Sequence, residues 1–222
     1  MTLIELVRHV SSLIGTPAAV LAGIAAALVV ISRDWRLTMF AYLAENVMLA
    51  VLLVQIIPVE WALLQAIVAG LIGVIIYMSA RQLRPVETYG PAWIGRWPQM
   101  ATLTIFRMLT TALAAVTFLA IRTEVTLPVI RPPILDLFLW LVLIGLLGLA
   151  LHEEPLHAGL SLLTVVAGSQ LLIFTLMPQR ILVGALGAVQ ILLGLAVSYL
   201  VLSRGLASAA VTVEHGRLDA QR

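Results

Sequence analysis

Long uninterrupted runs of apolar residues constrain the fold of this chain more than any other feature. Seven runs can be delimited, at residues roughly 13–31, 37–57, 60–80, 100–121, 134–151, 156–176 and 180–203. A helix that crosses a bilayer needs about 20 predominantly apolar residues, which each run supplies. We therefore predict an all-α fold: a polytopic transmembrane helical bundle of about seven spans, forming a single domain over residues 1–203.

Composition excludes several classes of protein. With 62% hydrophobic and only 11% charged residues, the chain has almost no material for a soluble module. It contains no cysteine, which excludes disulfides, thiolate metal sites and cysteine-ligated clusters. The net charge of +2 reflects loop arginines and gives no support to nucleic-acid binding. All basic residues are arginine, a composition typical of GC-rich bacterial genomes, so we expect a bacterial protein. Because the apolar runs are expected to cross a membrane, we also expect lipid around them.

The distribution of loop arginines predicts the orientation, because cytoplasmic loops are enriched in basic residues. Four loop arginines fall on one side of the membrane. The first run is too long for the apolar part of a signal peptide, so we expect it to stay uncleaved. The N-terminus is then outside, and residues 204–222 form a flexible cytoplasmic tail. Eight arginines fall on the cytoplasmic side: Arg33, Arg36, Arg81, Arg84, Arg96, Arg204, Arg217 and Arg222.

A carboxylate interrupts the second run, in the stretch "FAYLAENVMLAVLL". Glu45 lies about nine residues into its helix, or ~13 Å deep, near the middle of the membrane. An acidic residue there costs about 2.5–3.5 kcal/mol, so the group is either protonated or paired inside the bundle. Both outcomes make Glu45 a candidate proton-relay residue. The alternative is an interhelical hydrogen bond that only holds helices together.

Other polar residues within the runs are candidates for supporting roles. Asn46 is expected to make an interhelical hydrogen bond, and buried glutamines bridge helices or hold water without exchanging protons. A basic residue near a span end either snorkels to the interface or pairs with Glu45. Gln170 is expected to be structural and Asp136 interfacial. The supporting set is Asn46, Gln65, Arg107 and Gln190.

One connector, "HEEPLH" from His152 to His157, has side chains that bind zinc or iron. The loop is short, has Pro155 in its middle and has no further ligands nearby. We therefore predict a solvated turn and no metal site. The sequence likewise contains no catalytic motif and no cofactor-binding motif.

The first three and the last three runs form similar triplets with short connectors. The third run contains "GLIGVIIYMSAR" and the seventh "ILLGLAVSYLVLSR", each an apolar stretch with glycine that ends in serine and arginine. With the fourth run as a linker helix, both triplets cross in the same direction. This pattern is consistent with two parallel three-helix repeats.

At "FAYLAENVMLAVLL" the chain resembles the hydrogenase-4 component E family of membrane subunits. That family is related to the K-type subunit of respiratory complex I and the C-type subunit of Mrp antiporters. The K-type pattern is three helices with an arginine-containing turn after the first helix, and "SRDWR" is similar to that turn. The last triplet looks like a second copy of the K-type pattern. K-type subunits use two buried glutamates in proton transfer, and this copy has Ser161 and Gln190 at the corresponding positions. In the first copy, Gln65 stands in the third run where a glutamate would be expected. Glu45 is then the one carboxylate deep in any run.

The resemblance implies an accessory or scaffolding subunit of a complex-I-like respiratory, group-4 hydrogenase or antiporter assembly in the bacterial inner membrane. Its partners would be other integral membrane subunits, and Glu45 would contribute one carboxylate to a lateral proton path. Any redox cofactor would lie in a partner chain, so this chain would be a non-catalytic subunit. Two alternatives stay open. One is a stand-alone, small proton-coupled transporter; the other is a purely structural subunit of a photosynthetic or respiratory supercomplex.

Overall fold

The computed structural model describes the backbone of residues 3–87, 97–125 and 130–219, and the side chains of 17–82, 104–125 and 130–205. These residues form helices and connecting turns, with no strand among them. The helices are α1 (Leu3–Ile31), α2 (Trp35–Leu53), α3 (Val59–Glu87), α4 (Trp97–Ile121), α5 (Pro132–Leu151), α6 (Pro155–Leu176) and α7 (Arg180–Asp219).

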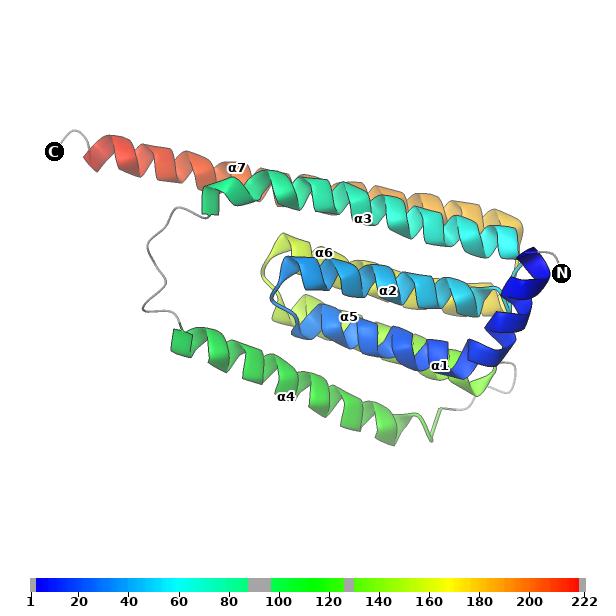
Figure 1. Ribbon diagram of the computed structural model, residues 1–222. Coiled ribbons are helices and arrows are strands. Elements are labelled where there is room, and N and C mark those ends of the chain that lie inside the picture. Colours follow the sequence, from blue (N-terminus) through cyan, green and yellow to red (C-terminus); the bar gives the residue numbers. More distant parts are fainter. Residues whose placement is uncertain (1–2, 88–96, 126–129, 220–222) are drawn as a thin grey trace.

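The predicted all-α transmembrane bundle is confirmed. Six helices, α2 to α7, are long and apolar enough to cross a membrane, and α1 has a shorter apolar segment over Pro17–Ile31. The first helix starts and the last helix ends at opposite ends of the bundle, as an odd number of crossings requires (Figure 1).

Proline and aspartate set several of the helix starts. Asp34 caps α2, because its carboxylate accepts a hydrogen bond from the backbone N–H of Arg36 at 3.0 Å. Helices α5 and α6 begin with Pro132 and Pro155, whose fixed φ suits the first turn and whose missing N–H would be unpaired there in any case.

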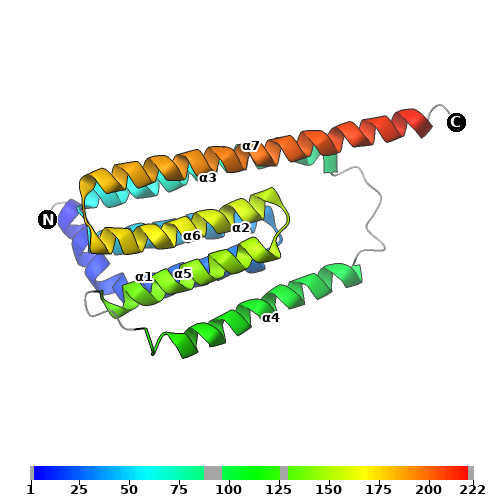
Figure 2. The same cartoon turned by 180° about the vertical axis from the view of Figure 1, so that it is seen from behind.

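Six of the helices form three stacked pairs, with α4 on the flank. Figures 1 and 2 show α3 beside α7, then α2 beside α6, then α1 beside α5. Within each pair both helices run in the same direction (Figure 1). Helix α4 contacts α1 and α5 at the outside of the third pair.

Each pair joins a helix of the first triplet to its counterpart in the last triplet. Helices α2 and α6 begin 120 residues apart, at Trp35 and Pro155. Two hydrogen bonds across the pairs, Thr164 with Glu45 and Ser79 with Ser198, each join residues 119 positions apart. This is the arrangement that two parallel three-helix repeats joined by α4 produce, with a pseudo-two-fold axis along the bundle.

Small residues let the helices approach closely. A Cβ atom added at Gly145 on α5 would lie 2.9 Å from the backbone oxygen of Ser161 on α6. A Cβ added at Gly194 on α7 would lie 2.8 Å from Cγ2 of Ile72 on α3. Within a membrane such contacts replace the hydrophobic driving force as the source of helix association.

The structure differs from the expectation of a flexible tail over residues 204–222. The backbone of α7 continues as a helix to Asp219. The segment after residue 204 contains no proline and is rich in alanine. Once a long span has nucleated the helix, each further residue adds one hydrogen bond at little cost, so the helix continues beyond the apolar run.

Candidate functional site

Glu45 is fully buried on α2 and faces α6. Its Oε2 accepts a hydrogen bond from the Thr164 hydroxyl at 3.1 Å. Its Oε1 is buried and has no hydrogen-bond partner among the described residues, and none of them forms an ion pair with Glu45. The bundle therefore encloses a carboxyl group with one oxygen bound and the other free to bind a proton or a water molecule.

Three buried glutamine side chains meet between α3, α6 and α7. Gln65 on α3 donates from Nε2 to Oε1 of Gln170 on α6 and to Oε1 of Gln190 on α7, both at 2.6 Å. Gln170 also donates from its Nε2 to the backbone oxygen of Leu186 at 3.1 Å. All three amides are buried. They bridge three helices, the role that the sequence suggested for glutamines in apolar runs.

Tyr42 connects the glutamines to the carboxyl group. It is fully buried one helical turn before Glu45, and it interacts with Glu45, Asn46 and Gln190. Its hydroxyl is close to these amides but makes no well-aligned hydrogen bond. The prediction that Asn46 bonds to another helix is wrong, because its Nδ2 donates to the Tyr42 backbone oxygen at 2.9 Å within α2. A side-chain amide satisfies its donor most easily on the carbonyl four residues earlier.

These residues form what we call the polar cluster, drawn from α2, α3, α6 and α7. Four of its buried atoms lack hydrogen-bond partners among the described residues: Tyr42 Oη, Glu45 Oε1, Gln65 Oε1 and Gln190 Nε2. Such atoms are uncommon in native interiors and mark sites that bind water or take part in chemistry. The members of the polar cluster are Tyr42, Glu45, Asn46, Gln65, Thr164, Gln170 and Gln190.

Chemically, the polar cluster suits proton binding better than metal or redox chemistry. Glu45 is its one carboxylic acid, and a carboxyl group can bind and release a proton, while the amides and hydroxyls serve as hydrogen-bond donors and acceptors. Across the part of the chain that the structure describes, no three His, Cys, Asp or Glu residues gather as metal ligands.

Sequence reasoning missed Thr164 and Tyr42. A threonine in an apolar run carries no signal of its own, since its hydroxyl usually bonds to its own helix. The repeat spacing supplies the missing signal, because Thr164 follows Glu45 by the same 119 positions that separate Ser79 from Ser198. Ser161, where the resemblance placed a lost carboxylate, instead donates to the His157 backbone oxygen at 2.9 Å.

Arg107 lies outside the polar cluster. It interacts with Glu154 and Arg33 near the turns that join α1 to α2 and α5 to α6. The expectation that it pairs with Glu45 is therefore wrong, and its placement fits the other expectation, a basic side chain that extends toward the interface.

The turn between α5 and α6 is solvated only in part: Glu153 and Glu154 are exposed, as the sequence predicted, but the two histidines are not. His152 and His157 are both buried, and their rings stack with centroids 5.0 Å apart. His152 Nδ1 donates to the Gly148 backbone oxygen at 2.8 Å, and His157 Nδ1 lies 3.0 Å from Glu154 Oε2. The turn is so short that both imidazoles fold back between the helix ends.

Electrostatics at this turn favour a neutral His152. Burial lowers the pKa of His152 to about 4, and the positive charge of Arg107 acts in the same direction. The hydrogen bond from His157 lowers the pKa of Glu154 below its ordinary value. Neither imidazole Nε2 has a partner among the described residues. The turn thus holds an acid that is readily ionised beside a histidine that resists protonation.

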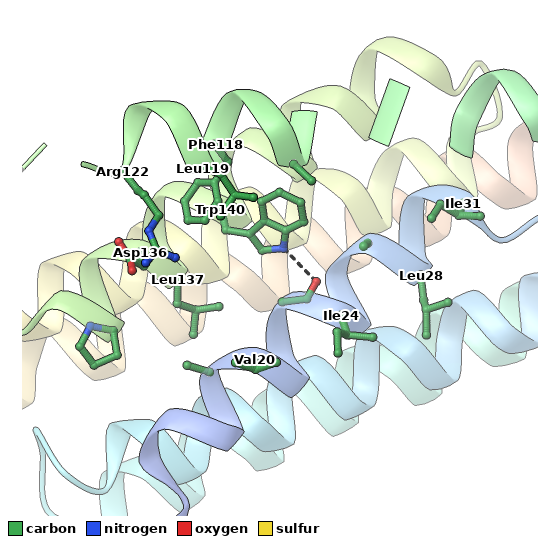
Figure 3. A pocket seen from close by; sticks show the side chains of 15 residues that line it. Val20, Ile24, Leu28, Ile31, Phe118, Leu119, Arg122, Asp136, Leu137 and Trp140 are labelled. Atoms are coloured by element: carbon green, nitrogen blue, oxygen red, sulfur yellow. Dashed lines mark hydrogen bonds between the residues drawn. The ribbon is translucent and has the colours of Figure 1, made fainter. Parts of the chain in front are cut away.

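A cavity of about 620 Å³ lies between α1, α4 and α5 and is separate from the polar cluster (Figure 3). It is lined mainly by apolar side chains, with Arg122 and Asp136 at one end. Asp136 near the start of α5 fits the interfacial position expected for it.

No protein-family model, curated protein or solved structure matches the chain. Function is therefore argued from the geometry of the polar cluster and from the sequence of α2.

Proposed function

We propose that this protein is an accessory integral membrane subunit of a complex-I-like respiratory, group-4 hydrogenase or antiporter assembly, in which Glu45 contributes one carboxylate to a lateral proton path. The observation that carries the proposal is the burial of Glu45 within four helices with one oxygen unpartnered. An ionisable residue inside a membrane bundle is costly, and its usual justification is a role in moving ions or protons.

The surroundings of Glu45 support a path that continues into other subunits. The polar cluster supplies amides and a phenol that can order water, but no second carboxylate or histidine. A relay of protons needs several titratable groups or a water chain. Glu45 would therefore be one proton-binding site in the path, and the other titratable groups of the path would belong to partner chains.

The choice of assembly rests on the resemblance of "FAYLAENVMLAVLL" to hydrogenase-4 component E. Partners are supported by α4, which stands at the flank and exposes Ile105, Leu109 and Leu113 to 65% each. Such a face suits contact with lipid and with further membrane subunits.

We infer from the loop arginines that the N-terminus is outside and the C-terminus is in the cytoplasm of a bacterial cell. A reporter that is active only in the cytoplasm, fused after Arg222, should then give signal. An active periplasmic reporter at the same site would overturn this orientation.

The proton path is tested by Glu45→Gln, which keeps size and hydrogen bonding but removes titration. We expect assembled complexes with this change to translocate fewer protons per electron or ion transferred, while Glu45→Asp retains more of the activity. The measurement is proton uptake by proteoliposomes that contain the purified complex. Wild-type translocation with glutamine at position 45 would reject the path.

A structural role is the second candidate, and the hydrogen bond from Thr164 to Glu45 favours it. In that case Glu45 only joins α2 to α6, and Glu45→Gln behaves as wild type in every assay. A stand-alone transporter would instead be recovered in mild detergent as a free monomer or homodimer with transport activity in liposomes. The proposed subunit should be recovered in a large multi-subunit complex.

A further inference from the structure

The cavity between α1, α4 and α5 (Figure 3) is a groove that is open to the surface of the bundle along α1. Three of its lining residues on α1 stay exposed, Val20 to 58%, Ile24 to 52% and Leu28 to 39%. The lining on α1 extends from Ala19 to Ile31, which is about 18 Å at the helical rise of 1.5 Å per residue. One leaflet of the hydrocarbon core is about 15 Å thick, so the groove has the length of one acyl chain.

The floor of the groove is apolar and its one indole donor is already used. Trp140 Nε1 donates to the Gly23 backbone oxygen at 2.9 Å, and the Phe118 ring meets the Trp140 ring edge-on with centroids 5.3 Å apart. Small residues on α1 and α4, including Ala27 and Ala115, leave the space open. A hydrocarbon chain fits this floor, whereas a polar ligand would find no free donor there.

The width of the groove argues against a helix as its occupant. Helix α4 contacts both α1 and α5, so the three helices converge beneath the groove. A transmembrane helix with its side chains is about 10–12 Å across and would have to push α4 away. A single acyl chain requires no such displacement.

The mouth of the groove carries one positive and one negative side chain. Arg122 follows the end of α4, and Asp136 lies in the first turns of α5, so both are at the same membrane interface. Figure 3 shows the two side chains reaching toward one another, and among the described residues they do not form an ion pair. A zwitterionic headgroup complements this pair, since guanidinium binds phosphate and a carboxylate accepts hydrogen bonds from an ammonium group.

We propose that this groove binds an aminophospholipid of the phosphatidylethanolamine class. One acyl chain lies along α1 against Trp140, the phosphate binds Arg122, and the primary ammonium donates to Asp136. Phosphatidylcholine has no N–H on its headgroup, and phosphatidylglycerol has no cation for Asp136. The site therefore discriminates by headgroup and not only by chain. It is independent of the polar cluster and of any assembly that the chain joins.

Trp140 supplies the readout, because bromine on an acyl chain quenches the fluorescence of an indole that it touches. The full-length protein is placed in phosphatidylcholine bilayers and titrated with brominated-chain phosphatidylethanolamine, phosphatidylcholine or phosphatidylglycerol. The Trp140 component is the emission lost in the Trp140→Phe variant. We expect phosphatidylethanolamine to quench this component at a mole fraction about two- to fivefold lower than the other two, the size expected of one solvent-accessible charged pair.

Three variants separate the headgroup from the chain. Asp136→Asn should abolish the preference for phosphatidylethanolamine, and Ala115→Phe should fill the groove and remove quenching by all three lipids. Arg180→Gln removes an arginine away from the groove and should change nothing. Equal quenching by the three lipids, an unchanged preference in Asp136→Asn, or a Trp140 that no brominated lipid reaches would each overturn the proposal. The comparison of the three lipids needs no variant other than Trp140→Phe to fold.

Discussion

Thr164 on α6 donates a hydrogen bond to Glu45 on α2 over 3.1 Å, and the two residues occupy matching positions in the two halves of the chain. The bond crosses the pseudo-two-fold axis and connects the fold to the candidate site. Its strength decides how far Glu45 acts as a structural contact.

Replacing Thr164 by valine tests this bond directly. Thr164→Val keeps the shape and leaves both Glu45 oxygens without a protein partner, so we expect a loss of stability of about 0.6 kcal/mol, up to ~2. The measurement is the free energy of unfolding in mixed micelles. Thr175→Val is the matched control, because the Thr175 hydroxyl donates to the Leu171 backbone oxygen of its own helix at 2.7 Å. Equal effects of the two changes would show that the interhelical bond contributes nothing.

Gln65 joins three helices through one amide nitrogen. Gln65→Leu leaves the Oε1 atoms of Gln170 and Gln190 buried without their donor, and each such atom costs about 1–3 kcal/mol. We therefore expect a clear drop in the free energy of unfolding. Gln82→Leu makes the same change at an exposed position on the same helix and should be close to neutral. A Gln65→Leu protein as stable as Gln82→Leu would contradict the amide bridge.

Gly148 on α5 packs against the Ser161 side chain on α6. A Cβ added there would collide with the Ser161 side chain, so Gly148→Ala should destabilise the protein by about 1–3 kcal/mol through overpacking. Gly184→Ala is the control, since nothing lies within 4 Å of the Cβ that it adds. Thermal unfolding followed by circular dichroism distinguishes them. A lower midpoint for Gly184→Ala than for Gly148→Ala would refute the packing shown here.

His152 should make stability depend on pH. Its folded-state pKa of about 4 lies below its ordinary value of 6.5, so the unfolded chain binds a proton that the folded protein refuses. The stability that this group contributes is present above pH 6.5 and decreases as the pH falls from 6.5 toward 4. His152→Gln should flatten that part of the curve of unfolding midpoint against pH. Identical slopes for the variant and the unaltered protein would argue against a neutral, buried His152.

The helices were predictable because their signals are local. Each span is an apolar run, and prolines such as Pro132 and Pro155 mark where helices begin. The burial of Glu45 was predictable because a carboxyl group in the middle of such a run is costly against lipid and therefore faces the bundle interior, whereas its apolar neighbour Val47 is 50% exposed. The extension of α7 to Asp219 was not, because helix propagation beyond a membrane depends on propensity and not on hydropathy.

The partners of Glu45 were not predictable from local signals. Which hydroxyl meets a buried carboxyl group depends on the register and rotation of α2 against α6, and apolar runs look alike under small shifts. Arg107 shows the same limit, because its interaction with Glu154 depends on where α4 sits beside the bundle. His157 is buried because the turn brings its ring against that of His152. Both side chains are polar, so the sequence alone suggested that they face water.

The pairing of matching positions across the axis limits how such a chain can arise by gene duplication. An ancestor with two identical triplets would have placed two carboxyl groups against each other where Glu45 and Thr164 now meet. Two acids in contact cannot both ionise, and one would be held protonated. A hydroxyl on one side removes this conflict and supplies the donor that the remaining carboxyl group accepts. Divergence of the two halves at this point is thus a condition for keeping one acid at the centre of the bundle.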